Sequence, residues 1–237
     1  MNTYPSRRAV VTGASRGLGL EFTRQLLARG ERVVATCRRP ASADALAALA
    51  KAHPDQLQVV ALSVDDEDSR QAFVQALAGM HEGLELLVNN AGVLERGERF
   101  GELRAGVMAD TFATNVIGPM LLAQALAPRL ARGQRPRVLN VSSRLGSIAS
   151  TASFNTPSYN ISKAALNMAG VLMAHAMNPM GIGVISASPG WVRTAMGGDG
   201  AELTVEESVH SLLKLVDDVP GLPAGVFLDR NGDTLPW

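Results

Sequence analysis

Short apolar runs rich in β-branched residues alternate along the chain with longer Ala- and Leu-rich stretches of helical periodicity. The strand-like runs are Arg8–Thr12, Arg32–Thr36, Leu57–Ser63, Leu84–Asn89, Arg137–Ser142, Gly183–Ser188 and Gly225–Leu228. The helix-like stretches between them are Gly17–Arg29, Ser42–Ala52, Asp66–Ala78, Val107–Ala131, Ser158–Met177 and Val205–Val216. Strands that are apolar on both faces and are joined by helices form parallel sheets covered on both sides. The pattern therefore predicts an α/β fold: a single doubly wound Rossmann domain over residues 1–237, with a seven-stranded, mostly parallel sheet and helices on both faces.

Charge and cysteine content exclude several classes of function. The 22 basic and 22 acidic residues give a formal net charge of 0, so no overall field attracts nucleic acid or anionic lipid. Cys37 is the single cysteine, which rules out an internal disulfide. A metal site is not expected, because metal-ligand spacing is absent among the four histidines, His53, His81, His175 and His210.

Neither a signal peptide nor a membrane span is expected. The segment Met1–Arg8 is short and polar, and the apolar run Ala9–Val11 that follows it is too brief for a signal peptide. The weakly polar stretch Ala164–Met177 is shorter than the roughly 20 residues that cross a bilayer. The sequence therefore predicts a cytoplasmic protein that binds neither membrane nor nucleic acid.

A glycine-rich segment, Thr12-Gly13-Ala14-Ser15-Arg16-Gly17-Leu18-Gly19, joins the first strand to the first helix. Small residues let the chain turn sharply, so that backbone N–H groups and the helix N-terminus can face a pyrophosphate. The glycine spacing differs from the usual G-x-G-x-x-G, and an isolated glycine loop can also be a simple turn. Its place between the first strand and the first helix of an α/β pattern favours dinucleotide binding.

Polar residues stand at the ends of three predicted strands. The fourth, fifth and sixth strands end in Asn89, Ser142 and Ser188, and each is followed by a polar or Gly/Pro-containing loop. The carboxyl ends of the strands form the ligand crevice in open α/β sheets. We therefore expect the site at this edge of the sheet.

The chain resembles the short-chain dehydrogenase/reductase family over its whole length. T-G-x-x-x-G-x-G is the family's cofactor motif, and its other motifs follow in order: Asn89-Asn90-Ala91-Gly92, Thr114-Asn115-Val116-Ile117-Gly118, Asn140-Val141-Ser142-Ser143-Arg144-Leu145-Gly146, Tyr159-Asn160-Ile161-Ser162-Lys163 and Pro189-Gly190-Trp191-Val192-Arg193-Thr194. The segment Gly225–Trp237 and the pair Cys37-Arg38 resemble the C-factor and sniffer-type carbonyl reductases. The resemblance implies an NADP(H)-dependent enzyme that interconverts a small-molecule carbonyl and an alcohol.

The resemblance also implies a catalytic set of Asn115, Ser143, Tyr159 and Lys163. Tyr159 would be the proton donor, and it suits this role if its pKa falls from about 10 toward the working pH. Lys163 lies one helical turn later on the same face, so its ammonium can favour the phenolate. Ser143 would hold the substrate oxygen, and Asn115 would hold a water that links Lys163 to solvent.

Two adjacent serines compete for the substrate-holding role. Ser142 or Ser143 could simply end a strand with local hydrogen bonds, as serine often does. The family's catalytic serine precedes x-x-G, and Gly146 fits that register for Ser143. The resemblance therefore favours Ser143 over Ser142.

The resemblance places the cofactor against a larger set: Gly13, Ser15, Arg16, Gly17, Leu18, Gly19, Cys37, Arg38, Ser63, Val64, Asn90, Ala91, Gly92, Tyr159, Lys163, Pro189, Gly190, Val192 and Thr194. An acid at the end of the second strand would bond the ribose of NAD, but Cys37 stands there, followed by Arg38. Arginine matches phosphate in charge and geometry, which favours NADPH. Ser63 replaces the family's usual adenine-facing acid, and either Ser63 or Asp65 can take that contact.

Other expectations concern substrate, dynamics and assembly. Three loops, Leu94–Arg104, Leu145–Pro157 and Trp191–Leu203, would build the substrate pocket, with Ala195–Leu203 either a mobile lid or an ordered turn. The helices Val107–Ala131 and Ser158–Met177 could pair across subunits in a homodimer or homotetramer, or only line the core. The likeness to C-factor leaves an alternative function, an NADP-binding regulatory or signalling protein with little turnover.

Overall fold

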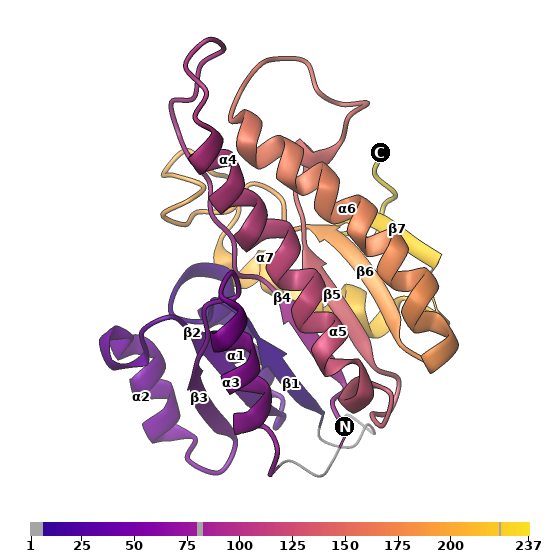
Figure 1. Ribbon diagram of the computed structural model, residues 1–237. Helices are drawn as coiled ribbons and strands as arrows, with labels where there is room; N and C mark the ends of the chain where they lie inside the picture. Colours follow the sequence, from indigo (N-terminus) through magenta and orange to yellow (C-terminus); the bar gives the residue numbers. More distant parts are fainter. Residues whose placement is uncertain (1–6, 80–82, 223) are drawn as a thin grey trace.

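Seven parallel strands form one sheet in the order β3-β2-β1-β4-β5-β6-β7 (Figure 1). The computed structural model describes residues 7–79, 83–222 and 224–237, so Met1–Ser6 and His81 lie outside the described residues. The strands are β1 Arg8–Val11, β2 Arg32–Cys37, β3 Leu57–Ala61, β4 Leu86–Asn89, β5 Arg137–Val141, β6 Gly183–Ser188 and β7 Ala224–Asp229. Every neighbouring pair of these strands is parallel, which confirms the predicted doubly wound sheet.

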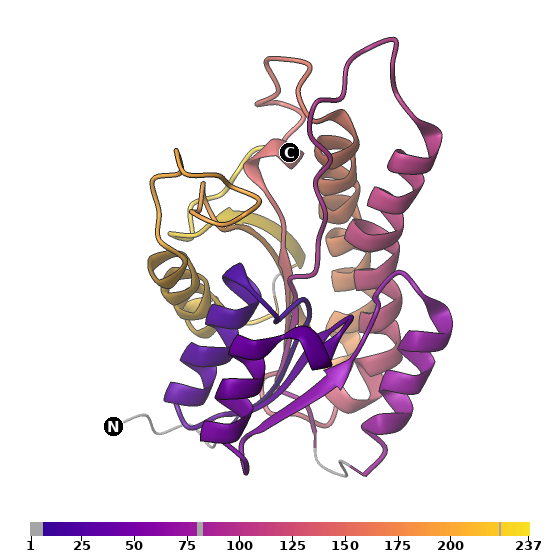
Figure 2. The same ribbon diagram turned by 90° about the vertical axis from the view of Figure 1, so that its left-hand side faces the viewer.

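Helices cover both faces of this sheet (Figures 1 and 2). One face carries α1 Gly17–Ala28, α2 Asp44–Ala52 and α7 Val205–Asp218. The other face carries α3 Glu67–Ala76, α4 Ala105–Phe112, α5 Gly118–Leu130 and α6 Pro157–Met177. Short 3-10 turns lie after β2, β5 and α6, at Pro40–Ser42, Arg144–Gly146 and Asn178–Met180. The helical periodicity thus predicts each main helix, with ends that shift by a few residues.

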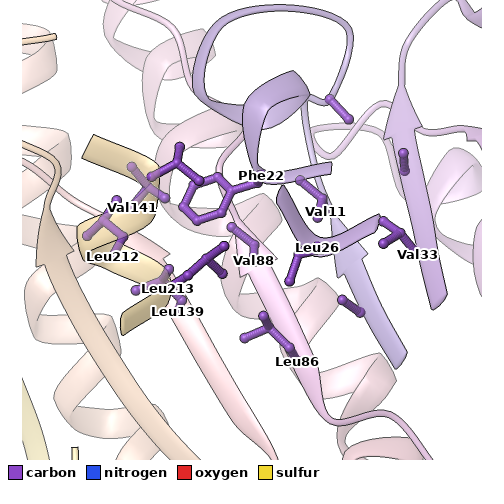
Figure 3. Packing of buried hydrophobic residues seen from close by; sticks show 14 of the residues in the cluster. Val11, Phe22, Leu26, Val33, Leu86, Val88, Leu139, Val141, Leu212 and Leu213 are labelled. Carbon is purple, nitrogen blue, oxygen red and sulfur yellow. The ribbon is translucent and has the colours of Figure 1, made fainter. Parts of the chain in front are cut away.

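The core consists of two apolar layers, one on each side of the sheet. Successive strand residues point to opposite faces, so Val10 packs with α5 and α6 while Val11 packs with α1 and α7. Figure 3 shows the layer that contains Val11, Phe22, Leu212 and their neighbours. Full burial of one such side chain stabilises the fold by about 1.5–3 kcal/mol. The two layers hold the strand ends in place, and with them the loops that follow.

The predicted long helix Val107–Ala131 differs from the structure at its centre. Residues Ala113–Ile117 form a π-helical turn between α4 and α5, and Asn115 is its middle residue. Pro119 lies four residues after Asn115 and has no N–H to donate to the Asn115 carbonyl. A regular helix is therefore incomplete here, and such π turns often occur at functional sites.

The continuous helical segment Ala105–Leu130 is long and apolar enough to cross a membrane, with a mean hydropathy of 1.2, and it is the one such segment among the described residues. In this fold it lies along the sheet, with Leu122 and Leu126 in the core. A core helix meets the same criteria of length and composition, so the segment is weak evidence for a membrane span. The expected cytoplasmic location stays a prediction.

Candidate active site

The glycine-rich segment after β1 adopts a conformation that requires glycine. Gly13 and Gly17 have φ of 65° and 54°, in the left-handed region that disfavours residues with a side chain. A Cβ at Gly19 would lie 2.3 Å from the carbonyl oxygen of Gly13, and a Cβ at Gly13 would lie 2.9 Å from Cα of Ala91. The loop therefore presents backbone rather than side chains at the N-terminus of α1, which suits a pyrophosphate.

Hydrogen bonds of the Thr12 and Asn90 side chains hold this loop in place. The Thr12 hydroxyl accepts from the backbone N–H groups of Asn90 at 2.9 Å and Ala91 at 3.0 Å. The Asn90 side chain donates to the carbonyl of Thr12 at 2.8 Å. Sequence reasoning places Asn90 against the cofactor, whereas its side chain is used here to hold the loop. Thr12, the first residue of the motif, is not among the predicted site residues. Ser15 and Leu18 lie half-buried on the same loop.

The residue after β2 and the segment after β3 place an exposed arginine near a carboxylate. Cys37 is buried, while Arg38 beside it and Arg16 in the glycine loop are exposed. The Ser63 hydroxyl donates to Asp65 at 2.5 Å. This hydrogen bond lowers the pKa of Asp65, and the positive charge of Arg38 acts in the same direction. Ser63 and Asp65 thus form one hydrogen-bonded unit near Arg38, and which of the two contacts the adenine stays a prediction.

The segment after β6 contacts the glycine loop. A Cβ on Gly17 would lie 3.4 Å from the Thr194 side chain. Pro189 is half-buried, Val192 is buried, and Gly190 has a φ of 82° that favours glycine. Val64, in the segment after β3, is buried as well. The structure thus brings the residues after β6 to the glycine loop, as the family motifs imply.

Tyr159 and Lys163 lie one turn apart on α6, and their side chains are buried. The Lys163 ammonium lies 5.4 Å from the centre of the Tyr159 ring and donates to the carbonyl of Val141, the last residue of β5, at 2.8 Å. Gly146 allows the chain after β5 to pack on α6, because a Cβ there would lie 2.7 Å from the carbonyl carbon of Lys163. The pair is therefore held between β5, the turn after it and α6.

The pKa values of this pair differ from the sequence expectation. Burial raises the pKa of Tyr159 to about 12, against a smaller lowering by its hydrogen bond with the Ser143 hydroxyl. Burial also lowers the pKa of Lys163 to about 8. Lys163 was expected to lower the Tyr159 pKa, but desolvation is the largest effect on that pKa and raises it. The buried phenol therefore stays protonated at neutral pH.

The two adjacent serines face different neighbours. Ser142 is buried and donates to the side chain of Asn167 on α6 at 2.6 Å. Ser143 is half-buried, accepts from the N–H of Leu145 at 3.1 Å and lowers the pKa of Tyr159. Ser142 is thus tied to Asn167, whereas Ser143 acts on the pKa of Tyr159, and the choice of Ser143 over Ser142 stays a prediction.

Asn115 is fully buried and joins three parts of the site. Its side chain accepts from the N–H of Val93 at 2.8 Å and donates to the Val93 carbonyl at 2.9 Å and to the Ser162 hydroxyl at 3.0 Å. Ser162 in turn donates to the carbonyl of Tyr159 at 2.7 Å. The side chain of Asn115 therefore anchors the loop after β4 to α6, and the water-holding role implied by the family stays a prediction. Ser162, inside the Y-x-x-x-K motif, is a further linking residue that the sequence did not single out.

The three predicted pocket loops meet above the carboxyl edge of the sheet, where two of them project upward (Figures 1 and 2). Arg96 donates to the carbonyl of Met196 at 2.6 Å, which links the loop after β4 to the loop after β6. The rings of Phe100 and Phe154 make an edge-to-face contact with centroids 5.7 Å apart. The loop that carries Arg96 and Phe100 therefore contacts both of the others.

A separate surface hollow of about 530 Å³ lies between α1 and α7. Its walls include Arg29, Glu206 and His210, and it is wide open to solvent. None of the predicted site residues lines it. The motif residues around Tyr159, rather than this hollow, form the candidate active site, because they combine the predicted proton donor with the glycine-rich loop predicted to bind phosphate.

Comparison with known proteins agrees with this geometry. Residues 7–202 match the family described as short chain dehydrogenase. C-signal of Myxococcus xanthus is 38% identical over 154 residues, which cover 65% of this chain and 93% of that protein. The NADPH-bound carbonyl reductase from chicken fatty liver has a TM-score of 0.93 at 35% identity, over 99% of this chain and 100% of that one. The carbonyl reductase Sniffer of D. melanogaster has a TM-score of 0.93 at 30% identity, over 98% and 100%. The resemblance carried by the sequence motifs is thus confirmed, and the chain belongs to the short-chain dehydrogenase family of oxidoreductases.

Proposed function

We propose that the protein reduces a small-molecule carbonyl to an alcohol with NADPH, and that Tyr159 donates the proton. The observation that carries the proposal is the burial of Tyr159 and Lys163 one turn apart on α6, with the Lys163 ammonium 5.4 Å from the centre of the Tyr159 ring. The Ser143 side chain also acts on this pair, since it lowers the pKa of Tyr159. A substrate carbonyl oxygen that accepts hydrogen bonds from the Ser143 and Tyr159 hydroxyls would be held in place and protonated there. The same residues would catalyse the reverse oxidation.

The glycine loop fits a dinucleotide, since Gly13, Gly17 and Gly19 leave no room for side chains where the pyrophosphate would lie. Arg16 in the glycine loop and Arg38 next to Cys37 are exposed, and Cys37 stands where an acid would repel a 2′-phosphate. These residues would hold NADPH, which supplies the hydride when bound. The NADPH-bound state of the related carbonyl reductase from chicken fatty liver supports the same cofactor here.

The side chains around Tyr159 would hold and move the proton. With a pKa of about 12, Tyr159 is protonated at neutral pH, which is the form that carbonyl reduction requires. The Ser143 hydroxyl would hold the substrate oxygen in line with Tyr159. Lys163 lies close enough to stabilise the phenolate that remains after the proton has left.

The test is the loss of NADPH absorbance when the purified protein is mixed with aldehydes, ketones and quinones. We expect turnover of at least one class by the wild type and its loss in Tyr159→Phe. Oxidation of NADPH without formation of an alcohol would count against carbonyl reduction.

A second candidate function is NADP-dependent regulation or signalling with little turnover, and the likeness to C-signal favours it. Such a protein would bind NADPH at the glycine loop without using the catalytic set. Calorimetric binding of NADPH combined with no turnover across the whole panel would support this candidate over the first.

We also propose that the protein forms a homodimer or homotetramer through the helices predicted as Val107–Ala131 and Ser158–Met177, which correspond to α4, α5 and α6. Of the apolar residues on these helices, Leu122, Leu126 and Met173 lie in the core, whereas Met168 and Leu172 are exposed. The exposed residues are available to a second copy, since apolar patches often mark contact surfaces. Light scattering that gives 24.9 kDa at micromolar concentration would reject the assembly.

A further inference from the structure

The helix that carries Tyr159 and Lys163 begins without a cap from its own flanking residue. Thr156, which precedes α6, has φ of 40° and ψ of 55°, and its hydroxyl is used in a hydrogen bond to Asn160 at 3.1 Å. Pro157 is the first helical residue and has no N–H. The N–H of Ser158, the next residue, lies in the first turn, where an acceptor must come from outside the helix.

Glu98 supplies that acceptor from the loop after β4, 60 residues away in sequence. One carboxylate oxygen accepts from the backbone N–H of Ser158 at 3.2 Å, and the other accepts from the Ser158 hydroxyl. Ser158 is fully buried. The carboxylate also places negative charge at the positive end of the helix, where it is favourable.

The glutamates of this loop differ in what they contact. Glu95 pairs with Arg104 at 2.9 Å on the exposed side of the loop. Glu102 is exposed, whereas Glu98 is half-buried and turned toward α6. The contact between Phe100 and Phe154 holds the same loop against the segment that leads into α6. Glu98 is therefore fixed in its position by the surrounding loop.

We propose that Glu98 is a positioning residue that acts through Ser158 on Tyr159. Tyr159 directly follows Ser158, so its ring is placed by the same first turn. When Glu98 accepts both Ser158 hydrogens, the turn stays formed and the phenol faces Ser143. Without Glu98 the turn opens part of the time, and the phenol is then displaced from the substrate oxygen. The catalytic part of this inference rests on the proposed function, while the contact between Glu98 and the helix does not.

The experiment compares Glu98→Ala, Ser158→Ala and the double variant with the wild type, using Glu102→Ala as a control on the same loop. Hydrogen exchange of peptides that cover residues 156–162 reports the first turn, whether or not the protein has turnover. Steady-state kinetics with NADPH and the best carbonyl of the panel separates kcat from KM. Glu98→Gln tests rescue, because its amide oxygen can still accept from the Ser158 N–H.

Loss of a helix cap shifts the capped population by about 2- to 30-fold. We therefore expect faster exchange and a kcat lowered by about 2- to 30-fold in Glu98→Ala and in Ser158→Ala, with partial recovery in Glu98→Gln. The KM for NADPH should stay within about twofold, because the glycine loop is untouched. The double variant should be no worse than Glu98→Ala alone, since Ser158→Ala removes only the hydroxyl hydrogen bond to the same carboxylate and keeps the N–H that Glu98 also accepts.

Exchange in Glu98→Ala equal to that of the wild type would overturn the inference, as would additive effects of the two single substitutions. A wild type that reduces no carbonyl would instead refute the proposed function. In that case the exchange data alone decide whether Glu98 holds the helix. A kcat unchanged in Glu98→Ala despite faster exchange would show that the contact does not position Tyr159, and would also overturn the inference.

Discussion

The ammonium of Lys163 lies 5.4 Å from the ring centre of Tyr159, yet it donates its hydrogen bond to the carbonyl of Val141. Both side chains are buried, and burial disfavours the charged form of each. At neutral pH Tyr159 is uncharged, so the electrostatic cost in the folded protein comes from the buried ammonium of Lys163.

Replacement of Lys163 by Met should stabilise the protein at neutral pH while it abolishes turnover. Between a folded pKa of about 8 and the ordinary value of 10.5, the unfolded chain binds more protons, so wild-type stability rises with pH across this window. At pH 7 Lys163 is charged and buried, so its burial costs the most. Lys163→Met should therefore raise the free energy of unfolding by about 1–3 kcal/mol, after subtraction of the lost hydrogen bond to Val141. Urea unfolding at pH 7 and near pH 10 measures this, and the gain should shrink at the higher pH. A variant less stable than the wild type at pH 7 would contradict the prediction.

Replacement of Tyr159 by Phe should lower turnover by about 10² or more, the usual contribution of general acid catalysis. NADPH affinity should change little, because the ring and its packing remain. In the wild type, the pKa of about 12 predicts that alcohol oxidation, which needs the phenolate, accelerates as pH rises toward that value. Stopped-flow absorbance measures both rates. A Tyr159→Phe protein that keeps more than about a tenth of wild-type turnover would place the acid elsewhere.

Replacement of Arg38 by Asp should weaken NADPH binding by more than about tenfold, because a charge-assisted hydrogen bond contributes about 1.5–3 kcal/mol. Binding of NADH should weaken less, since that cofactor has no 2′-phosphate. Arg39→Asp is a matched control beside it. Calorimetry on both cofactors gives the two affinities, and equal use of NADH and NADPH by the wild type would refute the preference.

Replacement of Gly146 by Ala should damage both stability and turnover. The new methyl would lie 2.7 Å from the carbonyl carbon of Lys163 and 2.9 Å from its Cβ. Overpacking of this kind costs about 1–3 kcal/mol, and displacement of Lys163 should lower kcat by about tenfold or more. Gly106→Ala in α4 is the control, since a Cβ there meets open space. It should raise the free energy of unfolding by at most about 1 kcal/mol, because alanine has a higher helix propensity than glycine. Thermal unfolding and steady-state kinetics are measured for both variants. A melting temperature and a kcat that are the same in Gly146→Ala and Gly106→Ala would argue against close packing at Gly146.

The segment Ala195–Leu203 should exchange its amide hydrogens more slowly when NADPH is bound. Arg96 holds this segment through the Met196 carbonyl, and Thr194 accepts from the N–H of Gly197 at 3.0 Å. Arg96→Ala should therefore speed exchange of the free protein, whereas Arg99→Ala on the same loop should not. Exchange that is equally slow with and without NADPH would identify an ordered turn rather than a lid.

Local patterns account for what could be predicted from the sequence. The alternation of β-branched and Ala/Leu-rich runs predicts the parallel sheet, because each run has a periodicity that suits one kind of element. Motif spacing brings Tyr159 and Lys163 onto one helix face, since four residues make about one turn. The family register selects Ser143 over Ser142, and the structure places these two side chains in different surroundings.

By itself, the sequence determined the order of the elements, the family and the identity of the residues at the carboxyl edge of the sheet. The tertiary structure decided how those residues are held and charged. The bond from Lys163 to Val141 and the contact from Glu98 to Ser158 join distant segments, which no local pattern encodes. The raised pKa of Tyr159 likewise depends on burial beneath loops that only the folded chain brings together. Desolvation and long-range hydrogen bonds arise from the packing of whole elements, and they become visible only when the chain is folded.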